Sequence, residues 1–172
     1  MERVFVGLGT NIEPREERLL KAREELYALP GVSPVAESKV YEAEPWGVTD
    51  QPMFLNQVVE IRCACEPEEL LRQLKELERL LGRESRRRWG PREVDLDILA
   101  FGRRRIDTTD LTIPHAELAR RAFVLGPWRD IAPDWRHPVT GKTIEDLWEA
   151  LANEQKTIRP HAVSSGTGRE QA

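Results

Sequence analysis

The sequence predicts an α+β fold in which an antiparallel sheet carries two helices on one face. The chain has 172 residues, of which 40% are hydrophobic and 33% charged, so it can bury one core and does not have the composition of a disordered chain. Apolar residues recur at period two in short segments and at helical spacing in longer ones. These segments follow the order β-α-β-β-α-β, which is typical of the ferredoxin-like arrangement.

The first half of the predicted fold is a strand, a helix and a second strand. Residues 4–8 alternate as a short buried strand, and Gly7 and Gly9 read as part of a tight turn into the helix. Asn11 is a suitable helix cap. The helix that follows carries an apolar stripe of Leu19, Ala22, Leu26 and Leu29 and ends at Pro30-Gly31. Residues 32–41 read as the second strand.

A loop with unusually large apolar side chains is predicted for residues 43–56. Residues 59–65 then read as a third strand, and Pro67 opens a second helix that Gly82 ends. A polar, arginine-dense loop covers residues 83–92, and residues 94–100 form the fourth strand. Two more helices are expected near residues 116–130 and 143–152. We expect one domain over residues 1–163 and a flexible tail over residues 164–172.

Charge and composition restrict the classes of function. The formal charge of −4 argues against a protein that coats nucleic acid through bulk positive charge. No segment resembles a signal peptide or a membrane span. Cys63 and Cys65 read as small core residues of a reducing compartment. These features favour a cytoplasmic protein with no membrane partner.

The strongest chemical signal is a pair of carboxylates beside the arginine-dense loop. Asp95 and Asp97 are two apart on a predicted strand, so both side chains leave the same face. Like charges on one face are unfavourable unless positive charge lies between them. Mg²⁺ coordinated by one or two carboxylates and by substrate phosphate would supply that charge. Salt bridges from Arg92 and its neighbours to a solvent-facing pair explain the pattern equally well.

Four segments resemble the 6-hydroxymethyl-7,8-dihydropterin pyrophosphokinase family. They are Gly9-Thr10-Asn11, residues 50–56 (DQPMFLN), residues 88–98 (RWGPREVDLDI) and residues 111–115 (LTIPH). The resemblance implies a ferredoxin-like fold and transfer of pyrophosphate from ATP to the hydroxymethyl group of the pterin, with release of AMP, in folate biosynthesis. It further implies ATP and a reduced pterin as the small-molecule partners and two Mg²⁺ ions. We expect a monomer that binds no nucleic acid.

The resemblance also implies roles for individual residues. Asp95 and Asp97 would hold the metal ions and, with Arg83 and Arg92, form the catalytic set. The pterin would contact Ala43, Trp46, Phe54, Asn56, Trp89 and Phe123, with the two Phe rings on its faces. ATP would contact Glu78, Arg83, Arg88, Arg92, Ile98, Thr112, His115 and Arg121. Phe54 replaces a Tyr found in many members, and Ala43-Glu44 replaces a frequent Thr-Pro.

Two other functions are compatible with parts of this pattern. One is a different two-metal nucleotidyl or phosphoryl transferase on the same kind of sheet, acting on another acceptor. The other is a ferredoxin-like RNA-binding module, which stacks bases on aromatic side chains of its sheet. The fourth predicted strand instead presents Asp95 and Asp97, which would repel a phosphate backbone in the absence of metal.

Overall fold

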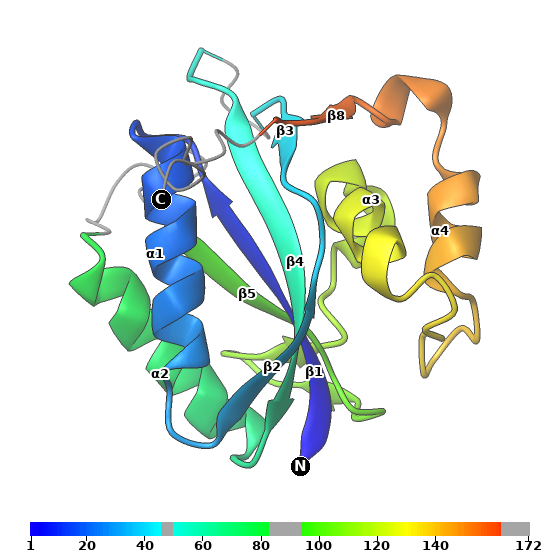
Figure 1. The fold of residues 1–172 in the computed structure, drawn as a ribbon. Helices are drawn as coiled ribbons and strands as arrows, with labels where there is room; N and C mark the ends of the chain where they lie inside the picture. The colour runs from blue at the N-terminus through cyan, green and yellow to red at the C-terminus, as the bar shows by residue number, and fades with distance from the viewer. Residues whose placement is uncertain (46–49, 83–93, 163–172) are drawn as a thin grey trace, which may run out of the picture.

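The computed structural model describes residues 1–45, 50–82 and 94–162 (Figure 1). The predicted tail at residues 164–172 lies outside these ranges, as does the arginine-dense loop up to residue 93.

An antiparallel sheet forms the centre of the protein (Figure 1). Its strands lie in the order β5-β1-β4-β3-β8, and β2 also pairs with β4. Every pairing in this sheet is antiparallel, as predicted. The bounds are β1 (Glu2–Thr10), β2 (Val32–Glu37), β3 (Tyr41–Ala43), β4 (Phe54–Cys63), β5 (Asp95–Phe101) and β8 (Ile158–Pro160). A separate two-stranded sheet is formed by β6 (Ile106–Asp107) and β7 (Thr112–Ile113).

Two helices cover one face of the sheet (Figure 1). They are α1 (Arg15–Tyr27) and α2 (Pro67–Leu80). Helix α1 buries Leu19, Ala22 and Leu26 of its expected stripe, whereas Leu29 lies past its end and is half-buried. Helix α2 buries an apolar stripe of Leu70, Leu74 and Leu77. The buried stripes of both helices join one core cluster with alternate residues of β1, namely Val4, Val6 and Leu8. Since alternate side chains of a strand point to opposite faces, the residues between them face the other layer.

The opposite face is partly covered by the C-terminal helices (Figure 1). These are η1 (Leu118–Arg120), α3 (Ala122–Ile131), α4 (Ile144–Ala150) and η2 (Asn153–Gln155). Trp128 of α3 is fully buried, with its ring centroid 4.9 Å from that of Phe5 and 4.8 Å from that of Trp135. This second core leaves part of the same face open. The open part is formed by the C-terminal end of β1 and the N-terminal ends of β4 and β5.

The structure corrects several predicted boundaries. The predicted strand at 32–41 is two strands, β2 and β3, because the Ser38 hydroxyl accepts the Val58 N–H where the ladder is interrupted. Strand β4 begins at Phe54 and not near residue 59, so part of the predicted 43–56 loop is strand. The helix expected from residue 116 begins at Ala122, after the short η1 turn.

Asn11 does not cap α1, contrary to the prediction. Pro14 occupies the N-cap position and makes no side-chain cap bond. The Asn11 amide instead donates to Gln51 Oε1 at 2.8 Å and to the Pro52 carbonyl at 3.0 Å. Asn11 therefore joins the end of β1 to the segment that precedes β4.

The final described strand was not predicted. Ile158–Pro160 pairs with β3, and no alternation longer than three residues marks it in the sequence. In the described part of the chain, none of the helices combines the length and apolar character needed to cross a bilayer.

Candidate active site

The floor of a pocket lies where two glycines interrupt the side chains of the central strand. Gly9 pairs with Asn56 of β4 on one side and with Asp95 of β5 on the other. Gly7 lies between Val58 and Asp97 in the same way. Both glycines are inside β1, so the expectation that they form a tight turn is wrong. Without a side chain at either position, the sheet surface between Asn56 and the two Asp residues stays open.

Close packing explains the requirement for glycine at one of these positions. A Cβ on Gly9 would lie 2.8 Å from Asn56 Nδ2, which is closer than real Cβ contacts. A Cβ on Gly7 would meet only the Leu99 side chain, at an ordinary 3.5 Å. Gly9 therefore allows the Asn56 amide to approach the central strand closely.

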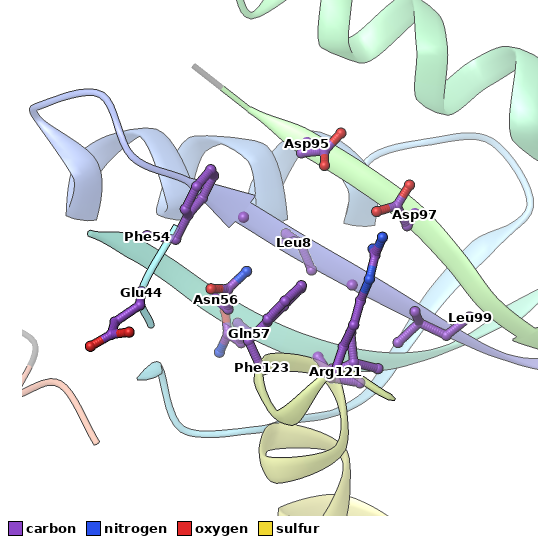
Figure 2. Close-up of a pocket in the computed structure, with 14 residues that line it drawn as sticks. Leu8, Glu44, Phe54, Asn56, Gln57, Asp95, Asp97, Leu99, Arg121 and Phe123 are labelled. Carbon is purple, nitrogen blue, oxygen red and sulfur yellow. The ribbon is translucent and has the colours of Figure 1, made fainter. Parts of the chain in front are cut away.

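The two aspartates lie on the pocket face of β5, as the spacing predicts. Both line the pocket and are half-buried, whereas the alternate residues Leu96 and Ile98 are buried on the α1/α2 side (Figure 2). The glycines opposite them leave room for a ligand beside the carboxylates. Carboxylate oxygens are the protein ligands that Mg²⁺ prefers, and one or two suffice when phosphate and water complete its coordination.

Two aromatic rings and one amide lie at the other end of the same pocket. Phe54, at the start of β4, and Phe123, in α3, both line it, and Figure 2 shows the Asn56 amide between them. Asn56 is 9% exposed, and its Oδ1 has no hydrogen-bond partner among the described residues. A buried acceptor without a partner is costly, so a ligand that donates a hydrogen bond at this point would be stabilised. A flat heteroaromatic ring with N–H groups on its edge has this chemistry.

The charged side chains of the pocket are mostly acidic. Three carboxylates, those of Glu44, Asp95 and Asp97, line it together with the guanidinium of Arg121. Arg121 precedes α3 in an extended conformation, and its guanidinium carbon lies 5.6 Å from the centre of the Phe123 ring. Figure 2 shows the side chain extending toward Asp97. An anionic ligand would need additional positive charge to enter here.

His115 lies near this charged end but is not a pocket-lining residue. Its Nδ1 accepts the Glu117 backbone N–H at 3.1 Å, and the backbone N–H of His115 donates to the Leu99 carbonyl at 2.9 Å. Burial, and secondarily the positive charge of Arg121, lowers the pKa of His115, while Glu117 and Asp95 act in the opposite direction. The imidazole is therefore favoured in its neutral form.

The structure gathers part of the predicted site. The predicted residues that line the pocket are Phe54, Asn56, Asp95, Asp97, Arg121 and Phe123. Ala43 is adjacent, since it pairs with Phe54 in the sheet. Those predicted residues that lie outside the described ranges are Trp46, Arg83, Arg88, Trp89 and Arg92.

Three expected nucleotide contacts lie elsewhere. Ile98 is buried in the core beneath α1 and α2, and Thr112 is exposed in β7. Glu78 of α2 is 4% exposed, and its Oε2 accepts the backbone N–H of Leu96 at 2.9 Å. Because Leu96 separates Asp95 from Asp97, Glu78 attaches α2 to the strand at the point where the carboxylates are presented.

Sequence reasoning missed Gly7 and Glu44 as lining residues and gave Gly9 only a minor role. The signal for the glycines was available, since alternation from Phe5 places Gly7 and Gly9 on one face of a strand. Glu44 was recognised only as a departure from the Thr-Pro of related proteins.

The chain is similar to known proteins over most of its length. A sequence model of the 7,8-dihydro-6-hydroxymethylpterin-pyrophosphokinase (HPPK) family matches residues 5–133. The chain is 43% identical over 152 residues to a 2-amino-4-hydroxy-6-hydroxymethyldihydropteridine pyrophosphokinase of Methylorubrum extorquens, covering 88% of this chain and 93% of that one. It is 36% identical over 160 residues to the protein of the same name from Aquifex aeolicus, covering 93% and 96%.

Solved structures share the fold. The chain superposes on a crystal structure of HPPK-DHPS in complex with substrates, with a TM-score of 0.68 at 15% identity. A Plasmodium falciparum HPPK-DHPS variant gives a TM-score of 0.71, also at 15% identity. The matches cover 87% and 92% of this chain but only 43% and 45% of those longer chains. The extent of the family match and the identity to full-length relatives show that this chain belongs to the HPPK family.

Proposed function

We infer that the protein is an ATP-dependent pyrophosphokinase of folate biosynthesis that transfers pyrophosphate from ATP to 6-hydroxymethyl-7,8-dihydropterin and releases AMP. One structural observation supports this function most directly. A subsite with two aromatic rings and an unsatisfied amide oxygen shares one sheet face with the Asp95/Asp97 pair. The first part suits a flat heterocycle and the second suits the metal-bound phosphates of ATP.

The pterin is proposed to lie between Phe54 and Phe123. Its ring presents two apolar faces and an edge with N–H donors, and aromatic side chains favour such stacking. Asn56 Oδ1 is the buried acceptor for one of these donors. Phe54 supplies the ring face without the hydroxyl of a Tyr, so stacking does not depend on that group.

Asp95 and Asp97 are proposed to hold two Mg²⁺ ions. The donor set fits, because both carboxylates are half-buried on one strand and face an open pocket floor. Magnesium bound there would neutralise negative charge on the phosphates and orient them. No cluster of three potential metal-binding side chains occurs among the described residues, and Mg²⁺ does not require one when substrate phosphate contributes oxygens.

The reaction is a displacement at phosphorus. The pterin hydroxyl oxygen forms a bond to the β-phosphorus of ATP, the bond from that phosphorus to the bridging α-β oxygen breaks, and AMP leaves with the electron pair. The hydroxyl proton passes to solvent. The protein contributes mainly position and charge to such a transfer. We propose that Arg121 stabilises the phosphates, since its side chain extends toward Asp97 (Figure 2). Some contacts stay predictions from the resemblance. They are the ATP contacts of Arg83, Arg88 and Arg92 and the pterin contacts of Trp46 and Trp89.

The same proposal includes ATP contacts by His115, Thr112, Ile98 and Glu78, and a pterin contact by the Ala43 backbone. Of these, His115 is supported best, because Asp95 and Arg121 both lie close enough to affect its pKa. The side chains of Glu78 and Ile98 lie on the far face of the sheet, so the structure gives no support to a direct ATP contact by either.

An RNA-binding function has less support. Such a module stacks bases on an open sheet face, whereas here α3 packs on β4 and buries Phe5 and Val58 with Trp128. The open remainder of this face presents Asp95 and Asp97, which repel phosphate.

We also propose a cytoplasmic monomer in which residues 1–163 act as one domain. The free thiols of Cys63 and Cys65 are typical of a reducing compartment. A single sheet includes strands from Glu2 to Pro160, which supports one folding unit. Light scattering on the purified protein measures the oligomeric state, and a dimer mass would contradict the monomer.

Product analysis tests the function. The protein is incubated with Mg-ATP and 6-hydroxymethyl-7,8-dihydropterin, and nucleotides are separated by chromatography. We expect AMP and the pyrophosphorylated pterin in equal amounts. Release of ADP, or AMP formation only with a different acceptor, would favour the alternative transferase.

A further inference from the structure

Arg15 joins the two ends of the connection between β3 and β4. Its Nη1 donates to Glu42 Oε2 at 3.0 Å and to the Met53 carbonyl at 3.0 Å. Glu42 lies in β3, just before Ala43 and Glu44, and Met53 directly precedes Phe54. One guanidinium nitrogen therefore binds both of the segments that carry the pocket residues Glu44 and Phe54.

The Arg15 side chain is itself held in a partly buried network. Its Nε donates to Glu13 Oε1 at 2.8 Å, and only 16% of the side chain is exposed. Glu42, whose side chain is 13% exposed, also accepts from Arg159 Nε of β8 at 3.2 Å. Hydrogen bonds from Arg159 and from Arg15 lower the pKa of Glu42, so this carboxylate stays charged. Charge-assisted bonds of this kind are stronger and better oriented than neutral ones.

The pairing that Arg15 reinforces is short. Strand β3 contributes only Tyr41–Ala43, and its last pair places Ala43 opposite Phe54. Beyond Ala43 the ladder ends, so the backbone just before Phe54 is held by contacts outside the sheet. The Asn11 amide binds Gln51 and Pro52, and Arg15 binds Met53, so consecutive residues before Phe54 are fixed from the α1 side.

We propose that Arg15 is a positioning residue for the pterin subsite. It does not line the pocket. It holds the start of β4 against β3, and thereby keeps the Phe54 ring at the correct separation from Phe123 for a flat ring to enter (Figure 2). This role rests on the proposed function only in naming the pterin as the ligand. The Asp95/Asp97 pair lies on β5, which β1 and β4 separate from β3 in the sheet, so ATP binding should be spared.

Arg15→Met tests the proposal because it keeps an unbranched apolar stem and removes the guanidinium. Steady-state kinetics are measured separately for each substrate, and binding of oxidised 6-hydroxymethylpterin is measured by calorimetry. We expect the pterin KM and Kd to rise about tenfold, since the two charge-assisted hydrogen bonds to Glu42 and Met53 are lost together with the one to Glu13, with the ATP KM within about twofold of wild type. Arg15→Lys keeps the charge and one of the two bonds, and its pterin Kd should lie between those of Arg15→Met and wild type.

Arg72→Met is the matched control. Arg72 also pairs with a glutamate, Glu69, but lies on the exposed face of α2. Its removal should leave both KM values unchanged. Thermal unfolding of each variant is recorded, so that affinities are compared below the unfolding transition.

Two results would overturn the proposal. One is a pterin Kd of Arg15→Met within twofold of wild type, and the other is an equal rise in the KM of both substrates, which would indicate a general structural effect. Failure of the wild type to form AMP would instead contradict the proposed function, and the pterin Kd comparison would still decide the role of Arg15.

Discussion

Replacing Gly9 by alanine tests the central feature of the pocket floor. The added Cβ would lie 2.8 Å from Asn56 Nδ2, about 0.6 Å inside the 3.4 Å at which ordinary contact begins. The Asn56 amide is buried on a short side chain, so relief of this overlap requires the amide to rotate or the strands to separate. Either movement displaces Oδ1, the acceptor proposed for the pterin.

The expected size of this effect follows from the cost of overpacking. Adding one carbon to a well-packed site costs about 1–3 kcal/mol. If the cost is removed by displacing Asn56, pterin affinity should fall by about tenfold or more, because 1.4 kcal/mol corresponds to a factor of ten. A non-hydrolysable ATP analogue should bind with nearly unchanged affinity, since the proposed metal ligands Asp95 and Asp97 lie on the other neighbouring strand.

Gly7→Ala is the matched control, and calorimetric titration with oxidised 6-hydroxymethylpterin is the assay. Both substitutions add one methyl group to the same face of β1, so the comparison isolates the contact with Asn56. The Gly7 Cβ meets Leu99 at an ordinary 3.5 Å, and we expect less than about a threefold change in pterin Kd. Equal pterin affinities for the two variants would refute the argument from the floor geometry.

Three other substitutions have distinct expected outcomes. Asp97→Asn should lower AMP formation by about 100-fold or more, because charge stabilisation of the phosphates is lost, while the half-exposed site changes the Tm little. Near-normal turnover would contradict the metal assignment. Glu78→Ala should lower the free energy of unfolding in urea by about 1–3 kcal/mol, because a buried backbone N–H of β5 loses its acceptor; an unchanged urea midpoint would argue against it. Burial, then the hydrogen bond to Asp130, raises the pKa of Tyr41 from 10.0 to about 12. As the pH rises, the unfolded state loses this proton before the folded state does, so the free energy of unfolding should fall between about pH 10 and pH 12. Tyr41→Phe should make this decrease smaller. The same dependence on pH in the variant and the wild type would disprove the assignment.

Much of the fold could be predicted because its signals are local. Period-two alternation places Asp95 and Asp97 on one face and Leu96 and Ile98 on the other, whatever the strand pairs with. The stripe of α2 and its end near Gly82 also follow from residues close in sequence. Errors arose where a distant partner decides the local structure, as with Ser38, which binds Val58 and divides one predicted strand into two.

The amino-acid sequence alone determined the α+β class, the shared face of the carboxylates, and the family resemblance that predicted Phe54, Asn56 and Phe123 as pterin contacts. Only the tertiary structure decided that Asn56, Gly9 and Asp95 form one row across three strands, since register depends on pairing between residues far apart in the chain. The roles of Arg15 and Glu78 have the same origin. Their carboxylate, carbonyl and N–H partners lie 18 to 38 positions away, a separation at which no periodicity reports on contact.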